Sequence, residues 1–403
     1  MSQYQDVIVV GAGVVGLSCA LALAQRGLEV TVVEAQKSFA PTLPCVDDPF
    51  DIRVVAISRA SEVFFQQCGV WSTMVQARVC DYQAIKVWDS VSDGIIHFWA
   101  DEFHEPNLGH IIEQRVILSA LWQALQSYPV KVITGQHIKA LDGEKALAEC
   151  HLDSGESLRA RLIIAADGAN SGVRSLLAIP STQWSYEQSA IVATVKGEKS
   201  HQKTAFQRFS PEGPLALLPL ANAYQSSIVW TSSPSQAKTL MQASPHEFGN
   251  ILAREIDGVM GGFELIGERA CFGLQTHHSK TYMKSRCILV GDAAHTLHPL
   301  AGQGVNLGLL DAAALVDLID RAHQQGQDYG LNTTMNAYER KRRLHNQSMI
   351  WAMELFKRGF SSQVPMIQWL RNTGLSWVDR QLPIKHWFAK MAFGTALISK
   401  VKT

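Results

Sequence analysis

The segment His298–Asp311, HPLAGQGVNLGLLD, combines residue types whose spacing suits contact with an electron-rich group. It follows a β-branched run at 288–290 and the dipeptide Gly291-Asp292. Three glycines remove side chains where a backbone must approach a bound group, and these are Gly302, Gly304 and Gly308. We expect Asn306 and Asp311 to open a helix. The bare amides at such a helix start favour partial negative charge, as on a phosphate or a ring edge.

A second glycine-rich turn follows the apolar run 7–10 near the N-terminus and reads G-x-G-x-x-G. A helix is expected over 17–26, and a second strand over 30–33 ends at Glu34. In such a βαβ unit Gly11 makes the tight turn, Gly13 lets a pyrophosphate reach the backbone, and Gly16 allows close packing. Glu34 is placed to bond ribose hydroxyls.

Glu34 also restricts which dinucleotide this turn could hold. Its charge would repel a ribose 2′-phosphate, and no arginine stands beside it, so NADP is not expected there. NAD and the adenosine half of FAD remain. The distant Gly291-Asp292 turn and its glycine-rich loop favour FAD, because a longer cofactor needs a second contact zone.

A third pattern lies between these two. The apolar run 162–166 leads into DGANSGVR, 167–174, which resembles the D-G-x-x-S-x-x-R motif of single-component flavin hydroxylases. Taken alone, this pattern is equally compatible with a turn in which Asp167 caps a helix. Together with Gly291-Asp292 and the His298–Asp311 segment, it resembles the UbiH/UbiF/VisC family of FAD-dependent ubiquinone-biosynthesis hydroxylases. The similarity is closest to the VisC/UbiI branch and extends over nearly the whole chain.

The resemblance implies a set of FAD contacts. Arg53 lies in a D-x-R-x-x-A-I-S segment whose arginine approaches the flavin, whereas Arg59 is expected on a helix surface. Arg115 lies in the segment Glu113-Gln114-Arg115, which resembles the family's E-N-R helix start, and the resemblance implies that it contacts FAD. The full cofactor-binding set expected is Gly11, Gly13, Gly16, Glu34, Arg53, Arg115, Asp167, Asp292, Gly302, Gly304, Val305 and Asn306. No catalytic base is assigned, and the flavin-loop candidates are Pro299, Gly302 and Gln303.

The expected fold is α/β, a Rossmann-like FAD-binding domain with an inserted antiparallel β-sheet substrate domain and a C-terminal helical tail. The FAD-binding domain is expected to comprise 1–75, 106–180 and 276–335, the substrate domain 76–105 and 181–275, and the tail 336–403. Four short β-rich runs suggest the inserted sheet. Residues of these runs that could line a substrate pocket are Phe206, Phe209, Leu217 and Trp230, although alternating apolar residues are more often ordinary core.

The implied reaction is hydroxylation of the aromatic ring of a polyprenylated phenol. NADH or NADPH would reduce FAD, and the reduced flavin would trap O2 as a C4a-hydroperoxide. Hydroxylation of another phenol and a flavin-bearing assembly subunit of a quinone-biosynthesis complex are alternatives, as is a plain NAD-dependent oxidoreductase. We expect the lipid substrate and O2 as partners, association with other ubiquinone-biosynthesis proteins, and a homo-oligomer.

Composition bounds the remaining classes. The formal net charge of zero gives no reason to expect nucleic acid, and seven scattered cysteines without a C-x-x-C pair fit a reducing compartment with no metal site. We expect a cytoplasmic protein. From 339 to 403, twelve lysines and arginines face three acids, a net charge of +9. Interleaved tryptophan and phenylalanine suit an anionic membrane surface, an acidic partner or packing on the catalytic body.

Overall fold

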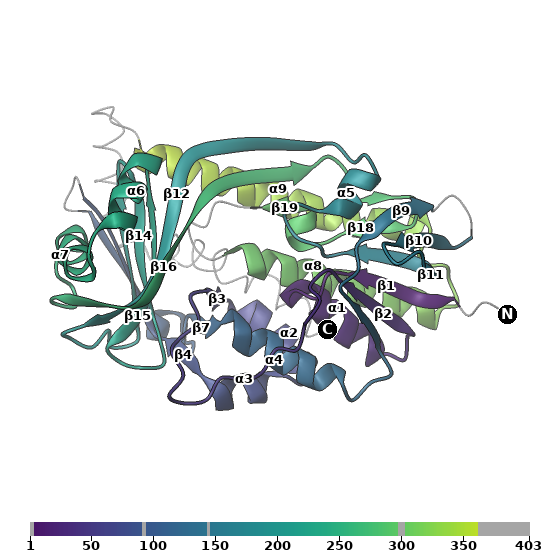
Figure 1. Ribbon diagram of the computed structural model, residues 1–403, viewed down its shortest axis with the longest axis horizontal. Coiled ribbons are helices and arrows are strands. Elements are labelled where there is room, and N and C mark those ends of the chain that lie inside the picture. The colour runs from purple at the N-terminus through teal and green to yellow at the C-terminus, as the bar shows by residue number, and fades with distance from the viewer. Residues whose placement is uncertain (1–3, 91–93, 143–145, 297–302, 362–403) are drawn as a thin grey trace.

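A mainly parallel sheet forms the centre of the larger domain (Figure 1). The computed structural model describes residues 4–90, 94–142, 146–296 and 303–361. Strand β1 (Gln5–Val10) is central and pairs in parallel with β2 (Val30–Glu34) and β11 (Ser157–Ala165). The other strands of this sheet are β8 (Lys131–Thr134), β18 (Cys287–Leu289), β17 (Met283–Lys284), β9 (Ile138–Asp142) and β10 (Ala148–Leu152). Its β-branched runs are buried on both faces, as parallel strands require.

Helices complete the core of this domain. Residues of α1 (Val14–Ala24), α4 (Gln114–Leu125) and α8 (Gln303–Gln324) share one apolar cluster with the strands. Three further helices lie around them, α2 (Arg59–Gln67), α3 (Trp71–Ala77) and α5 (Gly172–Leu176). The expected first βαβ unit is therefore present, with each element within a few residues of its predicted bounds.

A second sheet forms the smaller domain. Its order is β19-β16-β12-β15-β14-β13-β5-β6. The bounds are β19 (His295–Thr296), β16 (Phe263–Ser279), β12 (Ser181–Gly197), β15 (Gln225–Ser232), β14 (Gly213–Pro219), β13 (Thr204–Ser210), β5 (Ala84–Asp89) and β6 (Ile95–Trp99). All pairs are antiparallel except β13 with β5, which is parallel. The antiparallel sheet expected from the four β-rich runs is thus observed.

Two long strands connect the domains. β12 and β16 are antiparallel partners of 17 residues each, and they extend from the smaller sheet back to the parallel sheet (Figure 1). Helices α6 (Pro234–Gln242) and α7 (Pro245–Glu255) cover the face of the smaller sheet that points away from the larger domain. Near its other face lies a three-stranded sheet of β3 (Val54–Ile57), β7 (Gly109–Glu113) and β4 (Val79–Tyr82). Two 3-10 turns are η1 (Ala100–Phe103) and η2 (Gly291–Ala293).

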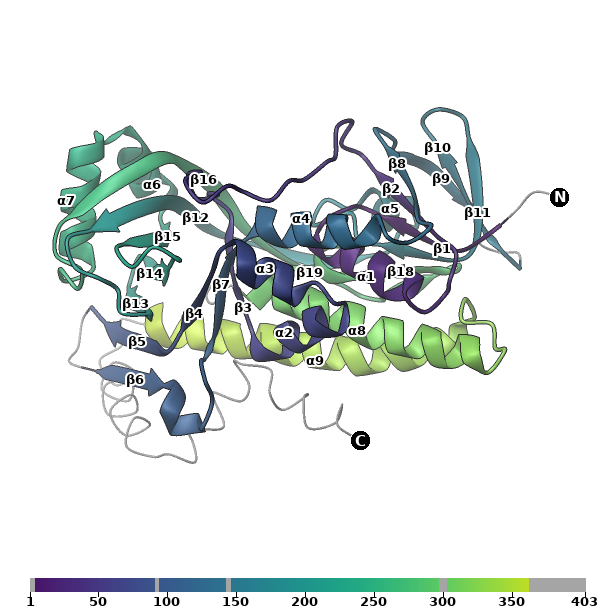
Figure 2. The same ribbon diagram turned by 90° about the horizontal axis from the view of Figure 1, so that it is seen from below.

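Helix α9 (Asn332–Ser361) runs along the molecule beside α8 and reaches the smaller sheet (Figure 2). It carries part of the expected basic tail, but one basic residue there is not a surface charge. Arg342 is 2% exposed and pairs with Asp311. The rest of the expected tail, 362–403, lies outside the described residues. Among the helices described, none combines the length and apolarity needed to cross a bilayer.

Candidate functional site

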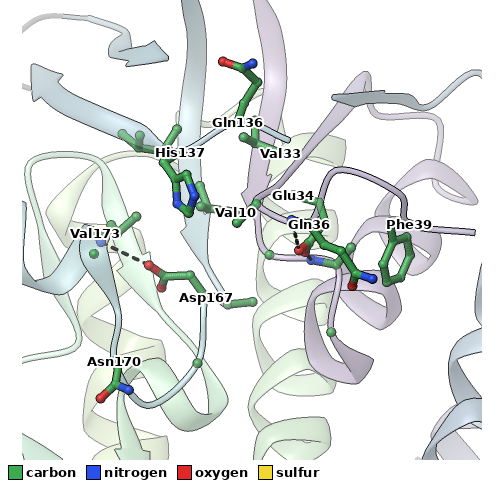
Figure 3. A pocket seen from close by; sticks show the side chains of 18 of the residues that line it. Val10, Val33, Glu34, Gln36, Phe39, Gln136, His137, Asp167, Asn170 and Val173 are labelled. Carbon is green, nitrogen blue, oxygen red and sulfur yellow. Dashed lines mark hydrogen bonds between the residues drawn. The ribbon is translucent and has the colours of Figure 1, made fainter. Parts of the chain in front are cut away.

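A cavity of about 610 Å³ opens at the carboxyl ends of the central parallel strands (Figure 3). Its walls come from the first βα turn, the end of β2 and the segment after β11. The site residues that line it are Gly11, Gly13, Glu34, Arg53 and Asp167. The first glycine-rich turn, the segment of Arg53 and the segment of Asp167 are far apart in the sequence but meet in one place, the position where open α/β sheets bind ligands.

The three glycines of the first turn differ in what surrounds them. Gly11 has φ +99°, and a Cβ there would lie 2.5 Å from the Ala166 carbonyl oxygen. A Cβ on Gly16 would overlap the Gly11 carbonyl oxygen. At Gly13 a Cβ would meet nothing within 4 Å. The outer two glycines thus allow close backbone packing, whereas Gly13 faces open space in the cavity.

The amides at the start of α1 are suited to a phosphate. Gly13 is the N-cap residue, no side chain caps the helix, and the first turn has no acid. Exposed N–H groups at a helix N-terminus form an anion site. The unfilled space at Gly13 is in front of these amides, so a pyrophosphate fits here by both shape and charge.

Two carboxylates flank this position. Glu34 accepts hydrogen bonds from the Ala12 amide at 2.6 Å and the Gln36 amide at 2.8 Å, which fixes its direction at the cavity wall (Figure 3). Asp167 accepts from the Val173 amide through Oδ2, while its buried Oδ1 has no protein partner. This oxygen can therefore accept a hydrogen bond from a group bound in the cavity. The cavity thus fits the adenosine and pyrophosphate of a dinucleotide.

The two predicted arginines are placed differently. Arg53 is exposed and lines the cavity. Arg115 does not line it, because its guanidinium is bound by Glu113 and the Pro49 carbonyl. Arg115 therefore holds the chain segment that leads to Arg53, and a direct cofactor contact is not what this geometry supports. Arg59, expected on a helix surface, is half-buried and paired with Glu62 and Glu105.

Several cavity residues had not been predicted. Gln114, and not its neighbour Arg115, lies at the cavity wall, and Phe39, Gln136, His137 and Asn170 are also among the lining residues. Gln136 and His137 follow β8, whose parallel pairing with β2 brings both strand ends to one edge. The strand-like run at 131–134 after a helix was the signal that could have located them.

The other end of the expected cofactor site begins at the Gly291-Asp292 turn. Gly291 has φ +56°. The Asp292 residue is exposed at the surface, but the protein around its carboxylate limits hydration and so raises its pKa. A Cβ on Gly304 would lie 4.0 Å from Asp292 Oδ1. Gly308 has another role than predicted, since a Cβ there would lie 2.6 Å from Val15 Cγ2. Gly308 allows α8 to pack on α1 rather than a ligand to approach.

The start of α8 also corrects the sequence interpretation. The helix begins at Gln303, so neither Asn306 nor Asp311 opens it. The Asn306 side chain accepts from the Ser58 amide and the Ser61 hydroxyl, and it donates to the Ala56 carbonyl. These protein partners occupy an amide that was expected to bind the cofactor. Asn306 instead fixes α8 to the β3–α2 connection.

The remaining flavin-loop candidates lie partly within the described residues. Pro299 and Gly302 lie outside the described residues. Gln303 is the first residue of α8, and Val305 is half-buried against the core of the larger domain. Within the described part of the chain, no cluster of three or more histidine, cysteine or acidic residues is placed to hold a metal.

The structure does not bring the four predicted pocket residues together. Leu217 and Trp230 are buried in the cluster that the smaller sheet forms with α6 and α7, and Phe206 packs against it. This cluster lies on the face away from the larger domain (Figure 1). Phe209 is buried on the opposite side of β13, because side chains alternate along a strand. Phe206, Leu217 and Trp230 are therefore core residues and not a pocket lining.

Comparisons with known proteins agree with this geometry. Residues 4–352 match the family described as FAD binding domain. The chain is 36% identical to 3-demethoxyubiquinol 3-hydroxylase of Escherichia coli (strain K12), covering 98% of this chain and 99% of that protein. It is 32% identical to ubiquinone hydroxylase UbiL of Rhodospirillum rubrum, covering 97% and 90%.

A solved structure supports the fold. The p-nitrophenol 4-monooxygenase PnpA of Pseudomonas putida DLL-E4 superposes with a TM-score of 0.78 at 17% identity, covering 98% of this chain and 99% of that one. The expected fold class, that of the class A flavoprotein monooxygenases, is confirmed. FAD is the cofactor of this family, and the cavity fits its adenosine and pyrophosphate. The chain belongs to the UbiH/UbiF/VisC family of FAD-dependent aromatic hydroxylases, whose members act in ubiquinone biosynthesis.

Proposed function

We propose that this protein hydroxylates the aromatic ring of a polyprenylated phenol during ubiquinone biosynthesis, using O2 and NADH or NADPH. The observation that carries the proposal is the 36% identity, over almost the full length of both chains, with a 3-demethoxyubiquinol 3-hydroxylase. Conservation of length matters because the inserted sheet, where a substrate would contact the protein, is included in the match. The substrate proposed here has the same chemical character as the compound in that relative's name.

FAD, when bound, supplies the electron transfer and oxygen activation that no amino-acid side chain provides. The protein must hold FAD, exclude water and orient the aromatic ring. We assign the adenosine and pyrophosphate to the cavity of Gly13, Glu34, Arg53 and Asp167. We assign the ring end to the Gly291-Asp292 turn and the start of α8.

The substrate ring and its prenyl chain would lie against the face of the smaller sheet opposite α6 and α7. Side chains that alternate with the buried Leu217 and Trp230 are on this face, and three of them are apolar and only half-buried, namely Ala216, Leu218 and Val229. Leu218 also contacts the apolar cluster near the three-stranded sheet. Half-buried apolar residues on a face that points toward the cofactor domain suit a lipid-like substrate.

The test combines genetics and biochemistry. In a strain that lacks this protein, mass spectrometry of quinone intermediates should reveal a polyprenylated compound one hydroxyl short of the normal product. Purified protein should convert that compound with stoichiometric NAD(P)H oxidation and O2 uptake. If a phenolic intermediate accumulates in the strain but the purified FAD-loaded protein does not convert it, the assembly-subunit alternative would be favoured. A normal intermediate profile would instead favour another phenolic substrate.

We further propose that α9 contributes to a contact with an anionic membrane surface and that the protein is a homo-oligomer. Leu344 and Trp351, 70% and 64% exposed, lie two helical turns apart, and Arg340 and Lys341 are exposed on the same helix. Each basic residue at an anionic surface contributes about 1 kcal/mol. Flotation with phosphatidylserine-containing vesicles should decline at high salt and in Leu344→Ser/Trp351→Ser. Flotation of this variant equal to that of the wild type would exclude the α9 contact. Sedimentation of the purified protein tests the proposed oligomeric state.

A further inference from the structure

A fully buried carboxylate lies behind the Gly291-Asp292 turn and has no part in the proposed FAD contacts. Asp311, in the middle of α8, is 0% exposed. Its Oδ2 accepts from the Gly291 amide at 3.1 Å and from His295 Nε2 at 2.6 Å. An unpaired charge in this position would destabilise the fold by several kcal/mol, so the charge must be compensated by its neighbours.

The compensation comes from α9. Arg342 Nε donates to Asp311 Oδ1 at 2.6 Å, and Asn346, one turn later, donates to the same oxygen at 3.1 Å. Arg342 also donates to Asn346 Oδ1 at 2.9 Å and to the Leu307 carbonyl of α8 at 3.3 Å. Burial alone would raise the pKa of Asp311, but His295 and Arg342 hold this pKa well below its ordinary value. The carboxylate is therefore ionised and has four donors.

The network continues to the long strand that joins the two domains. Asn346 Nδ2 donates to the Tyr282 hydroxyl at 3.3 Å, and that hydroxyl is 2.8 Å from His278 Nε2 near the end of β16. His278 is also the strand partner of His295. Since α9 itself contacts α8, β17 and β13, the Asp311 network links the flavin turn with elements of both domains (Figure 2).

The position of Gly291 decides what this network does. Gly291 directly precedes Asp292, and its positive φ brings its Cα close to Gly308, where a Gly308 Cβ would lie only 3.2 Å from it. The hydrogen bond from the Gly291 amide to Asp311 fixes the Val290–Gly291 peptide, which is the entry to the turn one residue before Asp292. A change in Asp311 would thus move Asp292 without removing any atom from the cofactor site.

We propose that Asp311 is a positioning residue for the FAD site, which acts through Gly291 on Asp292, and that Arg342 and Asn346 make α9 a structural part of this site. The C-terminal helix is then required for cofactor geometry and not only for packing or surface contact. Asp311 does not touch FAD in this scheme.

The test measures FAD binding and the flavin spectrum separately from stability. Asp311→Asn should raise the Kd for FAD at least about tenfold, the loss expected when a charge-assisted hydrogen-bond network is broken, and it should alter the visible circular dichroism of bound flavin. Asn346→Ala and Arg342→Lys should shift both in the same direction by a smaller factor. These milder variants carry the test if Asp311→Asn does not fold.

Two control variants separate positioning from general stability. Arg343→Gln changes the neighbouring arginine of α9, which is 42% exposed and pairs with Glu339, and should leave FAD affinity unchanged. Arg286→Gln breaks another arginine–aspartate pair, with Asp328 at 2.6 Å, and should lower the apoprotein melting temperature without altering the flavin spectrum.

A double-mutant cycle tests the route through Asp292. If Asp311 acts through Asp292, Asp311→Asn should reduce FAD affinity much less in an Asp292→Ala background than in the wild type. Equal, additive losses would overturn the proposal. So would Asp311→Asn, Asn346→Ala and Arg342→Lys proteins that melt earlier but bind FAD with unchanged affinity and spectrum.

Discussion

The first βα turn offers a matched pair of substitutions that separates ligand space from packing space. Gly13→Ala and Gly16→Ala each add one methyl group to the same glycine-rich turn. Gly13 has φ −69° and ψ 178°, which any residue can adopt, and an added Cβ meets nothing within 4 Å. A Cβ on Gly16 would overlap the Gly11 carbonyl oxygen.

The expected magnitudes differ in apoprotein and holoprotein. Alanine in place of an N-cap glycine costs a few tenths to about 1 kcal/mol, so Gly13→Ala apoprotein should unfold nearly as the wild type does. At Gly16, overpacking of about 1–3 kcal/mol opposes a helix-propensity gain of up to about 1 kcal/mol. Because the added Cβ meets a backbone atom that cannot easily shift, the overpacking cost is at the upper end of its range, and the Gly16→Ala apoprotein should have a free energy of unfolding lower by about 2–3 kcal/mol.

Added FAD should reverse the order of the two effects. With FAD at 100 times its wild-type Kd, binding stabilises the protein by about 2.7 kcal/mol. If the methyl group of Gly13→Ala blocks the pyrophosphate and raises Kd about 100-fold, the same FAD concentration adds only about 0.4 kcal/mol. Denaturant unfolding with and without FAD, together with a fluorescence titration of FAD, measures both quantities. Wild-type FAD stabilisation of Gly13→Ala, or an unaltered Gly16→Ala apoprotein, would refute this account of the cavity.

Three further predictions concern other parts of the molecule. Burial, with Arg59 near His110 and Arg174 near His277, lowers the pKa of each histidine to about 4. The unfolded chain therefore binds more protons than the folded one between pH 6.5 and 4, and the free energy of unfolding should fall as the pH decreases across this window, by up to about 3 kcal/mol for each histidine. Urea midpoints that stay constant from pH 7 to 4.5 would contradict this. Asp167→Ala should weaken FAD binding by about 1–3 kcal/mol if its unpartnered oxygen faces the cofactor, which a FAD titration of the folded variant decides. Leu217→Ala should lower the free energy of unfolding by about 2–5 kcal/mol and leave KM for the lipid substrate unchanged. Val229→Ala should change this KM with little effect on stability. The reverse result would place the substrate on the other face of the sheet.

The glycine pattern and the strand pattern were sufficient to predict the first βαβ unit and the inserted sheet, and the dinucleotide position that we propose follows from the same patterns. These features depend on local rules, since a G-x-G-x-x-G turn needs only its neighbouring strand and helix. The same locality explains why short motifs indicated Asp167 and Arg53, both of which line the cavity. It also explains why Arg115 was assigned in place of Gln114. The short E-Q-R motif marks the start of the helix but does not say which of its adjacent side chains faces the cavity.

The errors occur where a residue's partner is distant in the chain. Asn306 binds Ser58, 248 positions earlier, and nothing near Asn306 indicates that its amide is already occupied. For Phe206, Leu217 and Trp230, the alternation along the strands was visible in the sequence, but the covering helices α6 and α7 decide which face becomes core. Burial on one sheet face is a tertiary property and cannot be derived from strand periodicity alone.

Arg342 illustrates how such an error affects a functional argument. Counted by sequence, it is one of twelve basic residues that could give the C-terminal part an affinity for anionic surfaces. In the structure its guanidinium neutralises Asp311 and so belongs to the interior. The charge available at the surface is therefore smaller than the sequence count, while the same helix acquires a connection to the flavin turn. A truncation that removes α9 would then weaken FAD binding and surface contact together. Only a truncation that retains the complete helix can test the contribution of the segment beyond it.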